Sequence, residues 1–484
     1  MSPSKLTDLS ACAVVDLLQA EDITPLDLLD ALQERIGTVD CEVNALPTLC
    51  FDRARRHARD LMARPVAERG RLAGLPIPIK DLTRVAGVRT TFGSPIFADY
   101  VPEHSDVLVE NLEREGGVVF AKSATPEFGA GANTFNEVFG ATRNPWNTSL
   151  SAAGSSGGAA VALATGMAWV AHGSDFGGSL RNPASFCGVV GLRPSPGRVA
   201  RDPGPVVDDI LNVEGPMART VEDLALLLDA MVGESPYDPV SLPRTGQSYL
   251  EAARTQCRLT TVAFSADLGI TPVDPEIAEI CRRAAERFAD LGVTVEHAHP
   301  DLSGAKEAFQ TLRAAAFAAS HARKLEDYPE LLKPEMIWNI QKGLRLSASE
   351  IVKAEAQRAD IIKRTLAFFD KYDLLLTPAT VVPPYPVEAR FVEECAGVRF
   401  DTYIDWLAIA FSISLTTAPA LSLPCGYTSE GLPVGLQIVA RPRGEAMLLS
   451  CAAELERALD LKTARPIDPR PGNHEKPLRD HRSC

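Results

Sequence analysis

Residues 151–191 read SAAGSSGGAAVALATGMAWVAHGSDFGGSLRNPASFCGVVG, and the fold assignment starts from this stretch. It contains two clusters of serine and glycine, around Ser155 and around Ser179, whose positions differ by 24. Glycine lets a backbone approach a bound molecule closely and adopt conformations that other residues avoid. Both clusters are therefore typical of loops that present a serine hydroxyl to a substrate. A serine used in this way needs a base to activate it.

The composition narrows the class of protein. The chain has 484 residues, of which 45% are hydrophobic and 23% charged, as in an ordinary globular protein. This length suffices for one large domain or two medium ones with a substantial core. The net charge of −14 argues against nucleic acids and anionic membranes as partners, because both attract basic surfaces.

The cysteines and the apolar stretches indicate the cellular compartment in which we expect the protein. The ten cysteines form no Cys-x-x-Cys pair, which predicts free thiols in a reducing, cytoplasmic compartment. The first residues lack the apolar segment of an export signal. Residues 406–428 carry no charge, but Pro419 and Pro424 interrupt them, so we expect a buried helix followed by a buried strand. No membrane span is expected, and the chain is expected to act as a monomer or homodimer.

Helical and strand patterns alternate along the chain. Residues 1–70 are mainly helical in pattern, with Thr24 as a helix N-cap. LAGLPIPIKDL (72–82) is typical of a strand that enters a loop, and similar helix–strand steps recur through 71–462, which predicts an α/β domain. Within it, 300–375 is a helical cap or insertion. Residues 463–484 are rich in proline and charge, which predicts a flexible tail.

Histidine, the usual base for a serine nucleophile, has no obvious candidate here. His172 lies seven residues before Ser179, and we interpret it as a structural residue on a buried strand. His297 and His299 alternate to one face of a strand, but no carboxylate cluster completes a metal site, and a solvent-facing pair is the preferred interpretation. The remaining histidines lie on a charged helix face, outside the glycine-rich region or in the tail: His57, His104, His321, His474 and His481.

The segment Gly154–Gly158 matches Gly-x-Ser-x-Gly, the nucleophile elbow of α/β-hydrolases. That elbow requires a strand immediately before it, and the preceding RNPWNTSLSAA is polar and contains proline. A buried lysine is the alternative base, because burial lowers the pKa of an ammonium group. Lys80 fits, since it lies in an apolar run with no other charge between Arg71 and Asp81.

At this point the chain resembles the amidase signature family of Ser–Ser–Lys amide hydrolases. The resemblance covers roughly residues 70–460. It rests on GLPIPIKD (74–81), GATRNPWN (140–147), GSSGGAAVALATG (154–166), GSDFGGSLRNPASFCGVVGLRPSPGRV (173–199), PALSLPCG (419–426) and GLPVGLQIVARP (431–442). It implies an α/β fold with a large mixed β-sheet core flanked by helices on both faces, and neither cofactor nor metal.

The resemblance also implies a role for each serine. Ser179 matches the nucleophile, Ser155 the serine that relays protons, and Lys80 the base. Ser156 matches a neighbouring hydrogen-bonding residue, and the bond Gly154–Ser155 matches a cis peptide. The backbone amides of Phe176, Gly177, Gly178 and Ser179 would form an oxyanion hole, with Asp175 and Arg181 holding the loop. Phe176 departs from the family pattern, where threonine is common.

Substrate preference is inferred from aromatic residues near the expected site. The loop EFGAGANTFNEVFG (127–140) places the small residues Gly129, Ala130 and Gly131 between Phe128 and Phe135. The helical segment adds aromatic and apolar side chains, namely Phe309, Phe317, Ile337 and Trp338. We therefore expect an apolar or aryl amide, anilide or carbamate, with water as acyl acceptor. This segment offers no obvious pair of Arg and Asp to hold an amino-acid zwitterion, although the sequence leaves Arg313 and Arg323 open for this role.

Three alternatives stay open at the level of sequence. One is the glutamine-hydrolysing A-type component of a glutamyl-tRNA amidotransferase, which would require partner subunits. Another is an esterase or a carbamate hydrolase (urethanase), because these reactions share an acyl-enzyme step. The third is a non-catalytic scaffold, which an intact set of Lys80, Ser155 and Ser179 disfavours.

Overall fold

The N-terminal region is a group of helices that packs beside a small sheet. The computed structural model describes residues 3–206, 209–256, 258–461 and 466–472. It begins with helices α1 (Pro3–Thr7), α2 (Ala11–Gln19), α3 (Pro25–Val43) and α4 (Phe51–Met62). The Thr24 side chain accepts a hydrogen bond from the Asp27 amide in a capping box at the start of α3, which confirms the predicted N-cap.

The small sheet positions Lys80. It consists of β1 (Thr48–Leu49), β3 (Val118–Ser123) and β2 (Pro76–Lys80), in that spatial order, with α5 (Val107–Arg114) preceding β3. β2 runs parallel to β3 and every residue of both strands is buried. The predicted strand thus ends at Lys80, at the point where the chain turns toward the serine clusters.

An eight-stranded mixed sheet forms the centre of the protein. Its spatial order is β10-β9-β11-β15-β14-β7-β8-β6, with β9 parallel to β10 and β11 and the other neighbours antiparallel. The strands are β6 (Val170–Asp175), β7 (Val190–Arg193), β8 (Val213–Ala218), β9 (Thr261–Phe264), β10 (Thr294–His297), β11 (Leu374–Pro378), β14 (Ala420–Tyr427) and β15 (Pro433–Ala440). This mixed sheet confirms the predicted fold class.

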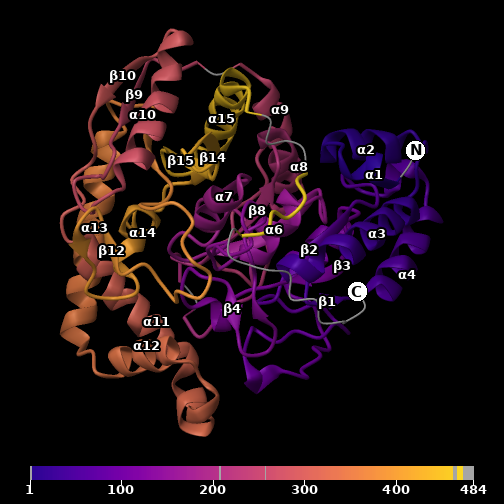
Figure 1. Cartoon of the computed structure of the whole chain (residues 1–484), viewed down its shortest axis with the longest axis horizontal. Helices are drawn as coiled ribbons and strands as arrows, with labels where there is room; N and C mark the ends of the chain where they lie inside the picture. Colours follow the sequence, from indigo (N-terminus) through magenta and orange to yellow (C-terminus); the bar gives the residue numbers. More distant parts are fainter. Residues whose placement is uncertain (1–2, 207–208, 257, 462–465, 473–484) are drawn as a thin grey trace.

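Helices cover the central sheet. All residues of β11 and of β15 are buried, and since neighbouring side chains in a strand point to opposite faces, both faces must be covered. The surrounding helices are α6 (Gly157–Ala164), α7 (Arg181–Cys187), α8 (Val221–Met231), α9 (Tyr249–Arg254), α10 (Pro275–Asp290), α14 (Ala408–Leu415) and α15 (Glu445–Leu459) (Figure 1). This arrangement places α6 and α7, which follow the two serine clusters, in the buried interior.

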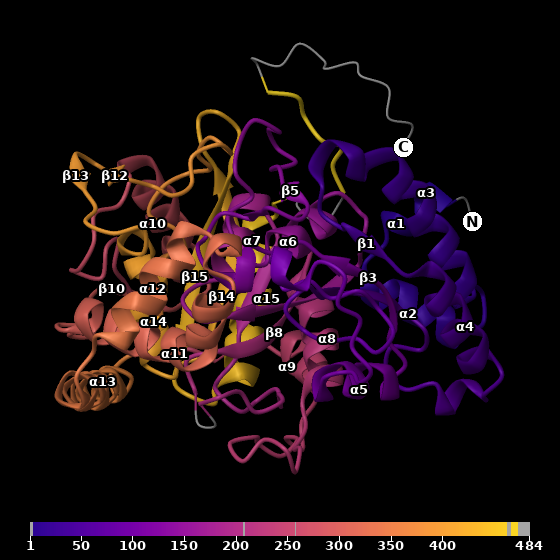
Figure 2. The same ribbon diagram turned by 90° about the horizontal axis from the view of Figure 1, so that it is seen from below.

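The segment 300–375 forms a separate group of helices at the edge of the molecule. It contains α11 (Ala305–Asp327), α12 (Pro334–Leu344) and α13 (Ala348–Phe368), as its sequence pattern predicted. Both ribbon views place these helices on the side opposite the N-terminal helices (Figures 1 and 2). α11 packs on α14, where the rings of Phe309 and Phe411 stack with centroids 4.3 Å apart.

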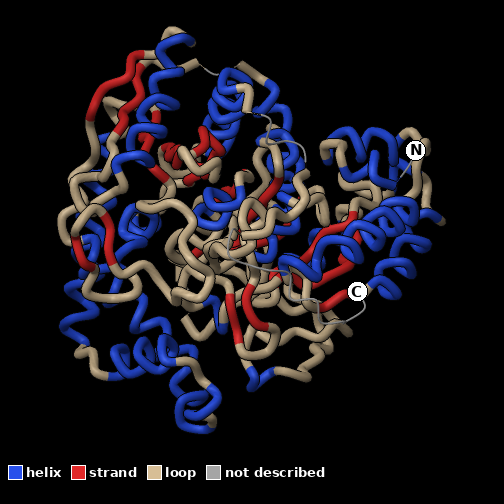
Figure 3. The backbone as a smooth tube through the Cα atoms, viewed as in Figure 1, coloured by secondary structure: helices blue, strands red, loops and turns tan. Residues whose placement is uncertain are grey.

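Loops and short elements complete the chain. Two short antiparallel pairs, β4 (Phe135–Asn136) with β5 (Gly140–Ala141) and β12 (Glu394–Cys395) with β13 (Val398–Arg399), lie outside the main sheet. Figure 3 shows β4 and β5 as isolated strands among loops. One-turn helices occur at Val66–Glu68, Pro95–Phe97, Glu127–Gly129, Pro329–Leu331 and Asp405–Leu407.

The structure bears on the predictions for residues 406–428, for the cysteines and for the C-terminal tail. Residues 406–428 form the buried helix α14 and the strand β14 as predicted, and in the described parts of the chain no helix is both long and apolar enough to cross a bilayer. Of the cysteines that the structure describes, seven are free thiols and Cys451 is disulfide-bonded, so the prediction of free thiols is wrong at Cys451. Residues 466–472 are hydrogen-bonded to the body of the protein, for example through Ile467 and Arg470, whereas 473–484 lie outside the described residues.

Candidate active site

Ser179 lies in a tight connection between β6 and α7. β6 ends at Asp175, and α7 begins at Arg181. Gly178 has a φ of 121°, and a Cβ added there would lie 2.7 Å from the Cβ of Ala410. Only glycine fits this position, because both the backbone conformation and the space exclude a side chain.

The first serine cluster meets the second through a backbone hydrogen bond. The bond Gly154–Ser155 is cis, as the resemblance implied, and α6 begins two residues later at Gly157. The Ser156 amide donates to the carbonyl of Ser179 over 3.2 Å. No strand precedes Ser155 within the described segment 142–154, so the requirement of a nucleophile elbow is not met.

Lys80 is fully buried beneath the two clusters. Its Nζ lies 2.8 Å from Oγ of Ser155, 2.8 Å from Oγ of Ser156 and 3.0 Å from Oγ of Ser174. Burial lowers the pKa of Lys80 to about 7, although the charges of Glu214 and Asp175 oppose the shift. A substantial fraction of Lys80 is therefore neutral at neutral pH and able to accept a proton.

His172 supports Lys80 from behind. It lies on the buried strand β6, as predicted, and its Nδ1 accepts a hydrogen bond from the Lys80 backbone amide over 3.3 Å. Its Nε2 lies 2.7 Å from a carboxylate oxygen of Glu214. Burial favours the neutral form of Glu214, but the hydrogen bond and charge of His172 keep the pKa of this carboxyl below its ordinary value. His172 is thus held between a backbone amide and a carboxylate rather than beside a serine hydroxyl.

Asp175 anchors the loop that carries Ser179. Its carboxylate accepts hydrogen bonds from the amides of Gly178 (2.9 Å) and Leu180 (3.1 Å) and from the guanidinium groups of Arg181 (3.0 Å) and Arg193 (3.2 Å). Burial opposes ionisation, yet the two arginines hold the pKa of Asp175 well below its ordinary value. Arg181 also donates to Ser414 and Gln437, which ties the loop to α14 and β15.

The hydrogen bond from Gly178 changes the predicted oxyanion hole. Because the Gly178 amide already donates to Asp175, it is not free to bind a substrate oxygen, and the expectation for this residue is corrected. The amides of Phe176, Gly177 and Ser179 have no hydrogen-bond partner among the described residues. Three of the four predicted donors therefore remain available.

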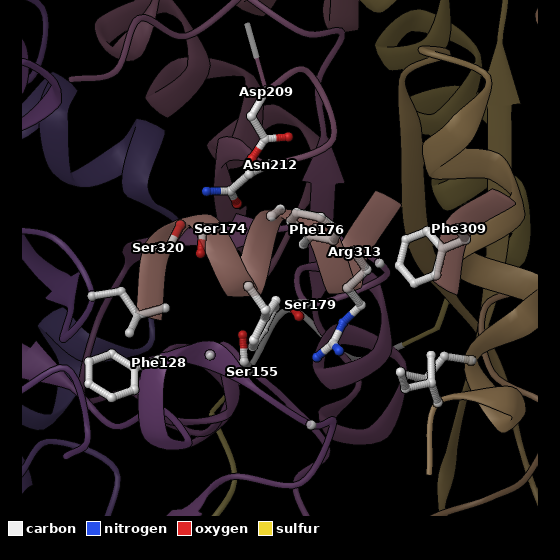
Figure 4. A pocket seen from close by; sticks show the side chains of 18 of the residues that line it. Phe128, Ser155, Ser174, Phe176, Ser179, Asp209, Asn212, Phe309, Arg313 and Ser320 are labelled. Carbon is white, nitrogen blue, oxygen red and sulfur yellow. The ribbon is translucent and has the colours of Figure 1, made fainter. Parts of the chain in front are cut away.

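Ser155 and Ser179 line one cavity of about 210 Å³ (Figure 4). Of the residues predicted around the site, Phe176, Gly177, Phe128, Gly129, Gly131, Phe309 and Phe317 line this cavity. Ala130 is buried and absent from the wall, and Trp338 instead packs on Tyr403, with ring centroids 5.7 Å apart. The structure thus brings the glycine-rich loops and α11 together at the serines but leaves these two residues outside.

Sequence reasoning missed part of the cavity wall. On α11, Ala316 and Ser320 were missed. They line the cavity at the helical spacing set by Phe309, Arg313 and Phe317, and this spacing is a signal that could have identified them. Other lining residues come from loops and from the one-turn helix that ends at Leu407, and they carry no local signal: Leu82, Asp209, Asn212, Tyr403, Ile404 and Leu407. Ser174, Glu214 and His321 complete the wall.

A second, larger cavity of about 530 Å³ adjoins the first. Both are lined by Phe128, Leu82, Asn212, Glu214, Ser320 and His321, so we call the smaller one the inner cavity and the larger one the outer chamber. Phe92, Phe97 and Tyr100 add an aromatic group to its wall, with the rings of Phe92 and Phe97 5.1 Å apart. Charged side chains of Arg84, Asp106, Arg201, Asp202 and Lys324 also line it.

The histidine pair considered as a metal site is solvent-facing. His297 and His299 are both exposed, in agreement with the preferred interpretation. Throughout the described ranges, no group of three or more His, Cys, Asp and Glu side chains is arranged to hold a metal ion.

Comparison with known proteins gives the class of this site. The family model for amidases matches residues 27–449. The chain is 33% identical to an acylamidase of Rhodococcus erythropolis, over 97% of this chain and 99% of the relative. It is 35% identical to the A-type component of the glutamyl-tRNA(Gln) amidotransferase of Moorella thermoacetica, over 95% of this chain and 98% of the relative.

A solved structure agrees with these sequence relationships. A bacterial aryl acylamidase of the amidase signature family superposes with a TM-score of 0.87 at 27% identity, covering 95% of this chain and 99% of that one. The mixed α/β fold and these relationships define a class of amide hydrolases. The chain belongs to the amidase signature family, and it is an amide C–N hydrolase.

Proposed function

We propose that the protein hydrolyses amides through an acyl-enzyme, with Ser179 as nucleophile, Ser155 as proton relay and Lys80 as base. One observation carries the proposal. The fully buried Lys80 Nζ lies 2.8 Å from Ser155 Oγ, and Ser155 and Ser179 line the same cavity. Since burial lowers the pKa of Lys80 to about 7, the neutral amine can accept a proton through Ser155.

The proposed reaction passes through an ester between the acyl group and Ser179. Ser179 Oγ attacks the amide carbonyl carbon while its proton passes to Ser155, whose own proton passes to Lys80. The C–N bond then breaks, and the relay returns a proton to the nitrogen, so that a neutral amine leaves and an ester to Ser179 remains. Water attacks this ester, transfers one proton to the leaving Ser179 oxygen through the same relay, and releases the carboxylic acid.

Free backbone amides would stabilise the negative charge that develops on the carbonyl oxygen. Phe176, Gly177 and Ser179 supply three amides without a partner among the described residues. Asp175 fixes this loop through Gly178 and Leu180, so the donors need no rearrangement when the charge forms.

Apolar or aryl amides are the proposed substrates. Phe176 and Phe309 meet edge to face at the inner cavity, with centroids 5.8 Å apart, and Phe92, Phe97 and Tyr100 line the outer chamber. Flat aromatic walls favour an aryl group by burial and edge contacts. The names acylamidase and aryl acylamidase among similar proteins support the same class. Esters and carbamates of similar shape would enter the same reaction, because they form the same acyl-enzyme.

Glutamine hydrolysis within an amidotransferase complex is the second candidate. The 35% identity to the A-type component of a glutamyl-tRNA(Gln) amidotransferase favours it. The two candidates differ in substrate, since a component of that kind would prefer glutamine over an anilide.

The test is a substrate panel with one covalent probe. We would measure kcat/KM for glutamine, an aliphatic amide, an acyl anilide and an aryl carbamate, expecting the anilide or carbamate to be best. Glutamine as the best substrate would favour the second candidate. A fluorophosphonate should label the peptide that contains Ser179, and EDTA should leave the rate unchanged because no proposed step uses a metal. Labelling of another serine would overturn the assignment.

A further inference from the structure

Arg313 lies in the inner cavity wall with only neutral partners. The residue is on α11, 7% exposed, and its guanidinium donates to the Asn339 side-chain carbonyl and, over 3.0 Å, to the Tyr403 hydroxyl. The group also lies over the Phe317 ring, 4.1 Å from its centroid. No carboxylate of the described residues comes within ion-pair distance of Arg313.

The acidic residues around this part of the cavity are already paired. Glu335 forms two hydrogen bonds with Arg390, at 2.7 and 2.6 Å, and Asp405 contacts Lys306 at 3.2 Å. The carboxylate of Glu127 accepts from the Ser94 hydroxyl and from the Lys333 backbone amide. None of these groups neutralises Arg313.

The two acids on the inner cavity wall are also engaged elsewhere. Glu214 is bonded to His172 at 2.7 Å, and Asp209 faces Arg201 at 3.9 Å. Figure 4 shows the Arg313 guanidinium on the side of the cavity near Ser179, whereas Asp209 and Asn212 lie on the opposite side.

Two lysines, Lys333 and Lys342, lie close enough to Arg313 to be affected by its charge. Burial lowers the pKa of both, and the positive charge of Arg313 lowers it further, although nearby carboxylates oppose the shift. A buried cation without a counter-ion is unfavourable, and it becomes favourable when a ligand brings the missing anion. A planar guanidinium matches the two oxygens of a carboxylate in particular.

We propose that Arg313 binds a carboxylate of the substrate, so that the preferred amides are anionic compounds whose apolar or aryl part separates the carboxylate from the scissile bond. This inference rests on the proposed function, because it names the substrate class of the same site. The carboxylate belongs either to the acyl group or to the leaving amine, and both sources present the same chemistry to Arg313.

The experiment compares matched substrates that differ only in charge. For the acyl side, the pair is glutaryl-4-nitroanilide and its methyl ester. For the amine side, it is 4-acetamidobenzoate and its methyl ester. We expect the carboxylate to exceed its ester in kcat/KM by roughly 10- to 100-fold in one pair, the range for a charged hydrogen bond in a buried site. Equal rates in both pairs, or faster esters, would overturn the proposal.

Variants assign the preference to Arg313. Arg313→Gln should lose most of the preference for the carboxylate, measured as the ratio of kcat/KM for the acid to that for its methyl ester within the same variant, and Arg313→Lys should retain part of it. The matched control is Arg323→Gln on the same helix, whose side chain is 91% exposed and pairs with Asp327. Retention of the full preference in Arg313→Gln would overturn the proposal. If Arg313→Gln fails to fold, loss of the ester activity reveals it, and the result for Arg313→Lys decides.

A binding measurement separates this inference from the proposed function. Two carboxylates are titrated calorimetrically into the protein and into Arg313→Gln. Glutarate represents the acyl group of the first substrate pair, and benzoate represents the amine side of the second. Binding that needs Arg313 supports the carboxylate site even if no amide is hydrolysed, in which case the proposed function alone fails. Amide hydrolysis without any such binding or charge preference overturns the carboxylate site alone.

Discussion

The ammonium nitrogen of Lys80 lies within hydrogen-bond distance of three serine hydroxyls, those of Ser155, Ser156 and Ser174. Lys80 ends a strand of the small sheet, whereas Ser155 and Ser156 immediately precede α6 and Ser174 lies on β6 of the main sheet. The site is therefore assembled across two sheets, and its geometry depends on how they pack. Only Ser155 and Ser174 of these three serines also line the inner cavity.

Substitutions at the proposed catalytic residues should be strongly non-additive. We expect Ser179→Ala to abolish acyl anilide hydrolysis, and Ser155→Ala and Lys80→Ala each to lower kcat by about 10³-fold or more, because the three groups act as one unit. The double variant Ser155→Ala/Lys80→Ala should be little worse than either single one. Steady-state kinetics with circular dichroism as a folding control would measure this. Multiplying effects would argue against a shared relay.

Activity should depend on the protonation of Lys80. Because burial lowers the pKa of Lys80 to about 7 and the neutral amine is the base, kcat/KM should rise as the pH increases through about 7. The negative charge of Glu214 opposes the shift. Glu214→Gln should therefore lower the pKa further and move this limb of the profile to lower pH. A limb that stays fixed, or moves to higher pH, would contradict this electrostatic coupling.

Asp175 should matter for both stability and activity. Asp175→Asn removes the carboxylate that two buried arginines share, which leaves their charges uncompensated and should cost about 3–5 kcal/mol in the free energy of unfolding. Urea denaturation measures this cost. The Asp175→Asn substitution should also lower kcat, since the Ser179 loop loses the carboxylate that fixes its conformation. Substitution of Asp370, an exposed acid paired with Arg441 at the surface, is the control and should cost less than about 1 kcal/mol.

The lowered pKa of Asp175 also predicts how the free energy of unfolding depends on pH. Its folded-state pKa is held below the ordinary value, so its stabilising contribution is fully present above the pKa of the unfolded chain, near 3.8. The contribution is lost as the pH falls from that value through the lower folded-state pKa. The wild-type protein should lose stability relative to Asp175→Asn across this acidic window. Parallel curves for the two proteins would contradict the prediction.

Local sequence patterns predicted the parts of the fold that neighbouring residues decide. Thr24 caps its helix, and the apolar run before Lys80 forms a strand, because neighbouring residues decide both features. The prolines in 406–428 correctly indicated a helix followed by a strand. The predicted helical character of 300–375 is also confirmed, since the segment contains α11, α12 and α13.

Features that depend on packing between distant segments could not be predicted from the sequence. Trp338 has the expected aromatic character, but the packing of α12 directs it to Tyr403 instead of the cavity. The loss of Gly178 as an oxyanion donor follows from one loop hydrogen bond to Asp175 that composition cannot reveal. The neutral surroundings of Arg313 depend likewise on Asn339 and Tyr403, which belong to other segments.

The outer chamber offers a test of where the leaving amine binds. Phe97 lines this chamber and packs against the rings of Phe92, Tyr100 and Phe128, with ring centroids 5.1, 5.8 and 6.1 Å apart, respectively. Since Phe128 lines both cavities, an aryl amine bonded to an acyl group at Ser179 would extend toward these rings. Phe97→Ala should therefore lower kcat/KM for an acyl anilide by about 2- to 10-fold, the value of one aromatic contact.

The comparison that decides this prediction uses a primary amide with the same acyl group. Its leaving group is ammonia, which is too small to reach Phe97, so its kcat/KM should change less than about twofold in Phe97→Ala. Tyr237→Ala, at an aromatic residue that is 68% exposed, should affect neither substrate. An equal loss for the anilide and the primary amide would mean that Phe97 supports the fold of the cavity as a whole. A loss confined to the anilide would locate the leaving amine in the outer chamber, because only that substrate carries a ring on the nitrogen side.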